Sequence, residues 1–190
     1  MTPADLKNEL CLRHGWPSEE IRYSELERDR VKMLVKIWDW AKELYIQPKE
    51  LWNEVWLSKD KYGNTVWHDA LTEGNFEVLE KLWDWAKELQ LNPEEIKNDV
   101  YLLKDKDGKT AWHMAAKRGE VEVIERLWDW AKELQLNPEE IKNDVYLLKD
   151  KDGKMAWQMA AIWGKVEVLE RLWDWAEELQ LKPEELRNVV

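Results

Sequence analysis

Two short segments of the chain are similar in composition to ligand-binding loops, and their spacing argues against both uses. Residues 108–110 (Gly-Lys-Thr) end like a phosphate-binding loop, but that loop needs an earlier glycine at the position where Leu103 stands. Residues 105–108 (Asp-Lys-Asp-Gly) match part of a calcium-binding loop, whose first and twelfth ligands would then be Leu103 and Met114. Neither apolar side chain can coordinate a hard cation. We therefore predict neither a phosphate site nor a calcium site.

The side chains that most often act as nucleophiles, bases or metal ligands are few and scattered. No cysteine and histidine have the spacing of a zinc site, and no serine has the glycine neighbours of a nucleophile elbow. An enzyme would require Cys11, His14 and Tyr23 to converge, and nothing in their spacing indicates that they do. We therefore predict a protein without catalytic residues, bound metal or cofactor. The histidines, the cysteine and the serines are His14, His68, His113, Cys11, Ser18, Ser24 and Ser58.

The tryptophans are the remaining group with possible chemistry, and there are fifteen of them against a single phenylalanine. Regular columns of indoles could form a cofactor box or an electron relay. They also recur at helical spacing, which is typical of a buried core. We predict the core role for three columns and place the last of them beneath an extra short helix. The columns are Trp83, Trp128 and Trp173; Trp67, Trp112 and Trp157; and Trp40, Trp85, Trp130 and Trp175.

Composition and charge exclude several classes of protein. Forty acidic against 29 basic residues give a net charge of −11, which repels phosphate backbones and anionic membranes. One cysteine cannot form an internal disulfide, and no apolar run has the length of a membrane span or the form of a signal peptide. We therefore expect a folded cytoplasmic protein of 190 residues with no nucleic-acid partner and no membrane partner.

The elements that position these residues follow from an internal repeat. The triplet Trp-Asp-Trp and a set of prolines both recur at a step of 45 residues, from Trp38 to Trp173 and from Pro3 to Pro183. The sequence therefore predicts a single repeat domain, 1–190, without insertions. It divides into unit one (3–47), unit two (48–92), unit three (93–137), unit four (138–182) and a C-terminal stub (183–190).

The sequence of each unit predicts three helical segments. In unit three, Asn92, Pro93 and Glu95 form the capping signature of a short helix. A turn over 104–109 follows, in which a glycine supplies the positive φ. A small-residue helix over 110–118 ends at a second glycine, and a longer amphipathic helix begins at Val121. The predicted fold class is all-α, with short β-turn or hairpin loops.

The segment 105–119 resembles the ankyrin repeat signature, in which Thr-Pro-Leu-His-x-Ala-Ala opens the first helix. Here Ala111 and Trp112 stand in place of the usual proline and leucine, and each unit is about a dozen residues longer than the common repeat of about 33 residues. The resemblance covers nearly the whole chain, is strong in units two to four, and implies an ankyrin-like helical repeat solenoid. It also implies that His68 and His113 are structural histidines that tie neighbouring turns together. Unit one departs from the signature, which predicts a divergent N-terminal capping unit.

Differences between near-identical units are the best indication of function. Units three and four match at 37 of 45 positions, and most of their differences fall within eleven residues. The pair Lys117 and Arg118 becomes Ile162 and Trp163, at the end of the first helix. The resemblance implies that this end lines a concave, partner-binding face. Exposed apolar side chains are avoided by soluble monomers unless a partner covers them.

We predict a partner-binding surface centred on an apolar group, Met155, Met159, Ile162 and Trp163. The predicted surface also includes residues at the positions where the units differ and at the matching positions of the other units: Lys117, Arg118, Lys165, Glu73, Gln158, Met114, Thr72 and Asp69. Replacing two polar residues by Met155 and Gln158 should also loosen the turn before the first helix. Trp52, at a position that is lysine in units three and four, is a further interface candidate. Two alternatives stay open: Ile162 and Trp163 pack against a C-terminal element, or Trp52 seals the divergent unit one.

The sequence therefore favours a protein-binding module without catalytic function. Its regularity suggests an idealised or engineered scaffold that carries a designed binding surface, in which case the chain is a recombinant protein. One alternative is a self-associating structural protein, a homodimer formed through the same apolar patch. Another is a natural ankyrin effector from a cell-dwelling microbe or its host. The identity of the protein partner is outside what these residues indicate.

Overall fold

The computed structural model describes residues 38–39, 42–43, 49, 52–57, 59, 63–182 and 184 of the chain. Almost all of unit one and of the stub 183–190 lies outside them, and so does the predicted capping role of unit one. Where the chain is described, it is helical, and no described residue belongs to a strand. The all-α prediction is therefore confirmed for this part, while the β-hairpin form of the loops is not seen in it.

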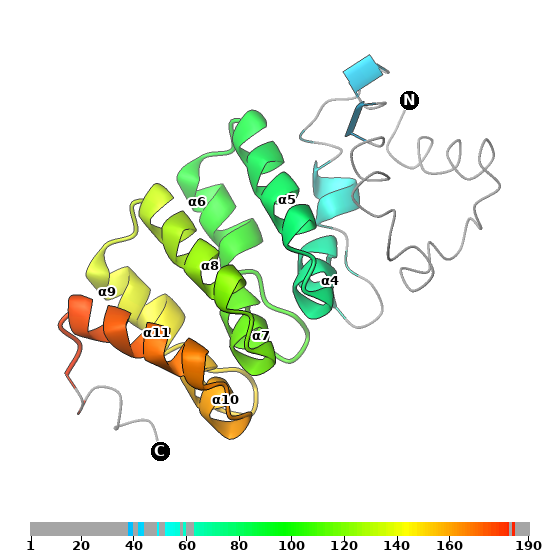
Figure 1. Cartoon of the computed structure of the whole chain (residues 1–190). Helices are drawn as coiled ribbons and strands as arrows, with labels where there is room; N and C mark the ends of the chain where they lie inside the picture. Colours follow the sequence, from blue (N-terminus) through cyan, green and yellow to red (C-terminus); the bar gives the residue numbers. More distant parts are fainter. Residues whose placement is uncertain are drawn as a thin grey trace.

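The same order of helices recurs at the 45-residue step. Each first helix of a unit packs against the longer helix that follows it, and equivalent helices of successive units lie side by side (Figure 1). The elements are η1 (Trp52–Trp56), α4 (Val66–Glu73), α5 (Phe76–Glu88), α6 (Pro93–Ile96), η2 (Lys97–Tyr101), α7 (Ala111–Arg118), α8 (Val121–Glu133), α9 (Pro138–Ile141), η3 (Lys142–Tyr146), α10 (Ala156–Ile162) and α11 (Val166–Glu178).

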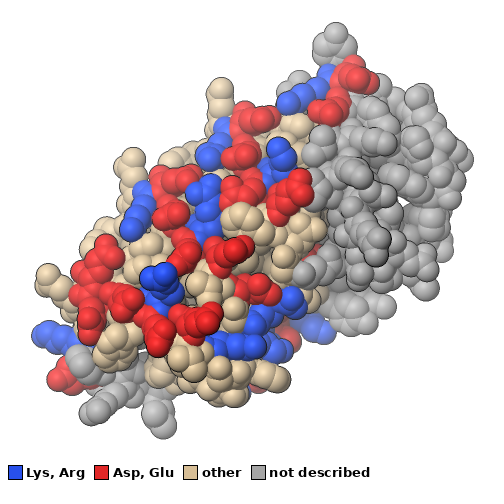
Figure 2. Space-filling view, viewed as in Figure 1, with Lys and Arg blue, Asp and Glu red and all other residues tan. Residues whose placement is uncertain are grey.

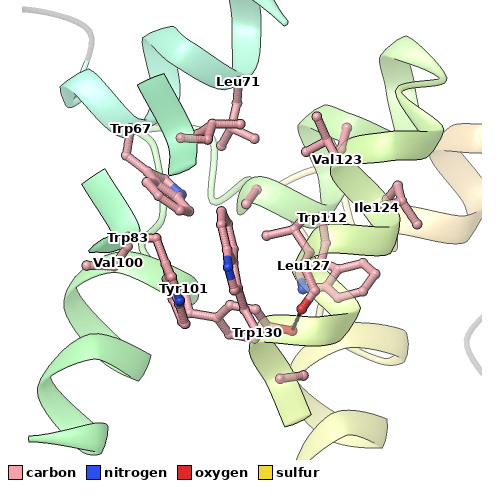
Figure 3. Close-up of a cluster of buried hydrophobic side chains, with 14 of the residues drawn as sticks. Trp67, Leu71, Trp83, Val100, Tyr101, Trp112, Val123, Ile124, Leu127 and Trp130 are labelled. Carbon is pink, nitrogen blue, oxygen red and sulfur yellow. Dashed lines mark hydrogen bonds between the residues drawn. The ribbon is translucent and has the colours of Figure 1, made fainter. Parts of the chain in front are cut away.

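The short helices begin where the capping signature predicts. Asn92 Oδ1 accepts a hydrogen bond from the Glu95 backbone N–H at 2.8 Å, and the Glu95 carboxylate accepts one from the Asn92 N–H at 3.1 Å. The helix then continues as the π-helical turn η2, which the sequence did not predict. That turn carries Tyr101 into the core, where its hydroxyl donates to the Leu127 carbonyl at 3.1 Å (Figure 3). The π-helical turn η2 is therefore joined to α8 by this hydrogen bond.

The loop over 104–109 is closed by side-chain and backbone hydrogen bonds. Asp105 Oδ1 accepts from the N–H groups of Asp107 and Lys109, both at 2.8 Å. Gly108 has a φ of 77°, as a turn glycine requires. The Lys151 N–H donates to the Asp107 carbonyl at 2.8 Å, so the turns of units three and four are joined directly.

Indole rings connect the units through the core (Figure 3). Three pairs of tryptophans from adjacent units are stacked. They are Trp38 with Trp85 (centroids 5.1 Å apart), Trp83 with Trp130 (4.5 Å) and Trp128 with Trp175 (4.6 Å). The first tryptophan of each triplet therefore stacks on the second tryptophan of the following unit. Trp85 also meets Trp56 of η1 edge-on at 5.6 Å, as predicted for the column beneath the short helix.

The core prediction is wrong for one member of these columns. Trp173 is 54% exposed, whereas Trp128 at the same position of unit three is 4% exposed. Trp128 is covered by Trp175 of the next unit, and no described segment covers Trp173 in that way. Trp157 of unit four is also more exposed than its equivalents: it is half-buried, whereas Trp67 and Trp112 are buried.

None of the helices in the described part of the chain combines the length and the apolar character that crossing a membrane requires.

Candidate functional site

The exposed large hydrophobic side chains of the described residues all belong to unit four: Ile162, Trp163, Val166 and Trp173. They are exposed for two different reasons. Ile162 and Trp163 stand at positions that are exposed in unit three as well, so a substitution made the surface apolar. Val166 and Trp173 stand at positions that are covered in unit three, and they are exposed because no described helix covers them. We call Ile162 and Trp163 the docking patch.

The docking patch lies at the end of α10, as predicted. Ile162 is the last residue of the helix and is 60% exposed, and Trp163 follows it and is 55% exposed. Lys117 of unit three reaches the patch, because its Nζ lies 5.2 Å from the centroid of the Trp163 ring. This cation–π contact fixes one side of the indole and leaves a large part of it open to solvent.

The prediction that Met155 and Met159 form part of this surface is wrong. Both side chains are buried, at 0% and 5% exposure. Met155 occupies the N-cap position of its helix, where Thr65 and Thr110 are equally buried in the other units. The position is interior whatever residue it holds, so methionine there fills core volume. Met114, at the position equivalent to Met159, is half-buried.

The predicted loosening of the turn before α10 is not seen, because Gln158 keeps its hydrogen bond. Gln158 Oε1 accepts from the Met155 N–H at 3.0 Å, as His113 Nδ1 accepts from the Thr110 N–H at 3.2 Å in unit three. Since Nδ1 is an acceptor there, His113 carries its proton on Nε2. That nitrogen lies 3.2 Å from the carbonyls of Leu148 and Lys154 in unit four. His113 therefore ties two units together, whereas Gln158 caps only its own helix.

The charged residues predicted around the patch are only partly brought to it. Arg118 is exposed, but its Nε lies 3.1 Å from Glu120 Oε1 rather than at the patch. Lys165 lies against Gly119, where a Cβ atom would collide with the lysine side chain. In unit two, the Thr72 hydroxyl donates to the His68 carbonyl at 2.8 Å. Asp69 is half-buried, and the side chain of Glu73 lies outside the described part.

Trp52 is also a wrong interface candidate, since it is 2% exposed and stacks on Trp56 with centroids 6.4 Å apart. The equivalent Lys97 explains this result. It too is buried, and its Nζ bridges Glu140 at 2.7 Å and Asp144 at 3.2 Å in the next unit. The position lies between units, so the lysine there forms a partly buried ion pair and does not indicate an exposed surface.

Burial sets the direction of the pKa shift of three described side chains, His113, Tyr101 and Tyr146. No group of three or more histidine, cysteine, aspartate or glutamate side chains is placed there to hold a metal ion. Burial lowers the pKa of His113, although Asp150 and the two carbonyls oppose that shift. Burial likewise raises the pKa of Tyr101 and of Tyr146 far above the ordinary value. All three groups act as neutral hydrogen-bonding residues within the helical stack.

Val166 and Trp173 are the exposed residues that the sequence analysis missed. Their identities match those of Val121 and Trp128, so no substitution indicates them. Only the structure, in which no described helix covers them, shows that they are exposed. Gly153 and Gly164 of unit four are likewise uncovered, because nothing lies within 4 Å of a Cβ atom built on either of them. A Cβ atom built on the equivalent Gly108 or Gly119 would contact residues of the following unit.

Comparison with known proteins adds no family to these observations. The chain matches no protein-family model, and a search of the curated proteins finds no match either.

Proposed function

We propose that this chain is a non-catalytic, ankyrin-like repeat protein that binds a protein partner through the docking patch. One observation carries the proposal: Ile162 and Trp163 are 60% and 55% exposed at positions where unit three holds Lys117 and Arg118. Two large apolar side chains thus replace two cations on an exposed helix end. Such a change has a cost in solubility that a bound partner removes.

The mechanism of binding is burial of this apolar pair. Tryptophan is strongly enriched at the energetic centres of protein interfaces, because a single indole removes about 150–250 Å² from water. Lys117 already holds the Trp163 ring from one side, which lowers the ordering cost of binding. Lys117 also places a positive charge beside the patch. The partner surface that fits is an apolar pocket with carboxylates at its edge.

The regularity of the array supports an engineered origin. Units three and four keep 37 of 45 positions, no unit contains an insertion, and the differences concentrate near one helix end. An idealised scaffold with a designed or selected surface has this form. Within the proposal, the chain acts in the cytoplasm or as a recombinant binder.

The proposal is tested by reversing the patch. A variant with Ile162→Lys and Trp163→Arg, used beside the wild type, should lose at least about tenfold in affinity for a partner captured by the wild type, measured by calorimetry. Its Tm should stay equal or rise, because both residues are exposed. The matched control, Asn98→Lys with Asn143→Lys, adds the same two charges at exposed positions of η2 and η3 and should bind like wild type.

Two results would contradict the proposal. Unchanged affinity in the reversed variant would show that the partner binds elsewhere. A clear fall in Tm would show that Ile162 and Trp163 stabilise the fold and do not serve to bind a partner.

A further inference from the structure

The outward side of α11 forms a second apolar surface, which we call the end face. It consists of Val166, Leu169, Glu170 and Trp173, whose spacing of three, four and seven residues puts them on one stripe of the helix. Val166 and Trp173 are 61% and 54% exposed, and Leu169 is half-buried. A single carboxylate, Glu170, lies within this apolar stripe.

Inside the molecule, the equivalent stripe of α8 is covered by α11, and two contacts define the fit. Trp175 stacks on Trp128 with centroids 4.6 Å apart and rings 5° from parallel. Arg171 Nε lies 2.9 Å from Glu125 Oε1. The covering helix thus supplies an arginine and, four residues later, a tryptophan.

The same pair of contacts occurs one unit earlier. Trp130 of α8 stacks on Trp83 with centroids 4.5 Å apart, and Arg126 pairs with Glu80, its Nη2 lying 3.0 Å from Glu80 Oε2. Trp83 also donates its indole N–H to Glu133 of α8 at 2.9 Å. Two independent examples in this molecule therefore show which helix the stripe accepts: one with arginine at position i and tryptophan at position i+4.

The end face has the same kinds of residue as the covered stripes, and no described helix covers it. Glu170 and Trp173 stand at the positions of Glu125 and Trp128. No cation pairs with Glu170 among the described residues. Trp173 donates its indole N–H to Glu177 Oε1 of its own helix at 2.8 Å, so the ring is already oriented while its face stays open. In unit three that position is Lys132, whose Nζ lies over the Trp128 ring.

Charge decides between a partner and a second copy of this chain. Arg171 is the one arginine of α11 and already pairs with Glu125, so two end faces brought together would offer no arginine to either Glu170 and would place like charges against each other. A helix that brings its own arginine to Glu170 would be attracted instead. Figure 2 shows that acidic and basic side chains alternate over the face that carries α5, α8 and α11, which is the pattern expected where helices pair arginine with glutamate.

We propose that the end face is a second binding site, which takes an amphipathic helix carrying arginine at position i and tryptophan at position i+4. The arginine pairs with Glu170, the tryptophan stacks on Trp173, and the apolar side of the helix covers Val166 and Leu169. This proposal does not rest on the docking patch, because it is argued from different residues.

The test uses the full chain and a peptide with the sequence of residues 121–137, which contains Arg126 and Trp130. A lactam bridge on its polar side holds the peptide helical, as checked by circular dichroism, and a terminal dye reports binding by fluorescence anisotropy. We expect saturable binding to one site. Trp173→Lys and Glu170→Arg should each weaken it at least about tenfold. A peptide with Arg126→Glu should bind the Glu170→Arg chain better than the wild-type chain.

The control variant is Ile162→Lys with Trp163→Arg, which should bind the peptide like wild type and so separates this site from the docking patch. Three results would overturn the proposal: no saturable binding up to about 1 mM peptide, equal binding by the end-face variants, or no rescue by the charge exchange. Self-association of the chain that Trp173→Lys abolishes would also overturn it, in favour of a second copy as the occupant.

Discussion

Trp128 and Trp173 occupy the same position of successive units, and their surroundings differ completely. Trp128 is covered by the stacked ring of Trp175, whereas Trp173 faces solvent. The energetic role of an indole in this protein therefore depends on the neighbouring unit and not on its own sequence context. This pair offers a matched comparison between a core residue and a surface residue of one type.

We expect Trp128→Ala to reduce the free energy of unfolding by about 3–5 kcal/mol, because it leaves a large cavity between two units. Trp173→Ala should cost about 1 kcal/mol at most, since that ring is already half in water. Urea unfolding followed by circular dichroism measures both. Similar costs for the two variants would show that Trp173 is part of the core.

His113 makes the stability of the stack depend on pH. Its pKa in the folded protein is lowered by burial, so the unfolded chain binds the proton more readily. The stabilisation is therefore complete above the ordinary histidine pKa of about 6.5 and is lost as the pH falls below it. Protonation would also place a proton on Nδ1, which faces the Thr110 N–H.

We expect His113→Gln to show a smaller loss of stability than wild type between pH 7.5 and pH 5.5. Gln158 demonstrates that glutamine accepts the same backbone hydrogen bond. At pH 7.5 the variant should lose about 1 kcal/mol, because it gives up the contacts of Nε2 with unit four. Unfolding titrations at the two pH values measure the difference. Parallel pH dependence in the two proteins would exclude His113 as the source.

At the scale of the elements, short helices persist because their ends are capped and their sides are packed. Helix α6 has only four residues, too few for a stable isolated helix. The reciprocal hydrogen bonds of Asn92 and Glu95 fix its start, and the buried Val100 and Tyr101 anchor the π-helical turn that continues it. The local capping residues therefore determine where α6 begins, and the burial of Val100 and Tyr101 determines that it continues as a π-helical turn.

We expect Asn92→Ala to lower the free energy of unfolding by about 0.5–2 kcal/mol, because an N–H group at the start of α6 loses its acceptor. Asn98→Ala is the control, since Asn98 is exposed within η2 and caps nothing in the described structure. Thermal and urea unfolding of the two variants check this. Equal stabilities would mean that the cap contributes nothing measurable to the folded stack.

At the scale of the whole molecule, neighbouring units are coupled by several kinds of contact. Stacked indoles, the two carbonyls near His113 and the buried Lys97 all cross from one unit to the next. The net charge of −11 acts in the opposite direction between separate molecules, where like charges repel. The exposed apolar surfaces of unit four are thus carried by a molecule whose charge opposes self-association.

We therefore expect the wild-type chain to be a monomer at about 10 µM in low salt, a concentration at which a tight dimer would form. Light scattering measures the mass directly. The reversed variant, Ile162→Lys with Trp163→Arg, should have the same mass. A wild-type dimer that this variant converts to a monomer would favour the homodimer as the function of the docking patch.

Sequence reasoning located the helices well because its signals were local. The 45-residue step, the Asn-Pro-Glu-Glu caps and the glycines after the first helices all act within a few residues, and the helix bounds follow them. The candidate site was predicted only in part. Ile162 and Trp163 are exposed as expected, but Met155, Met159 and Trp52 are buried, since the substitution alone does not say on which side of a helix a position lies.

The amino-acid sequence by itself determined the repeat, the helical class, the excess of negative charge and the apolar replacement at the end of α10. The tertiary structure decided which positions lie between units. That is why Lys97 is interior, Thr110 and Met155 share one buried site, and Trp173 is open although it matches Trp128 in sequence. Burial is a property of contacts between segments about 45 residues apart, and identical residues in successive units differ whenever only one of them has a neighbour.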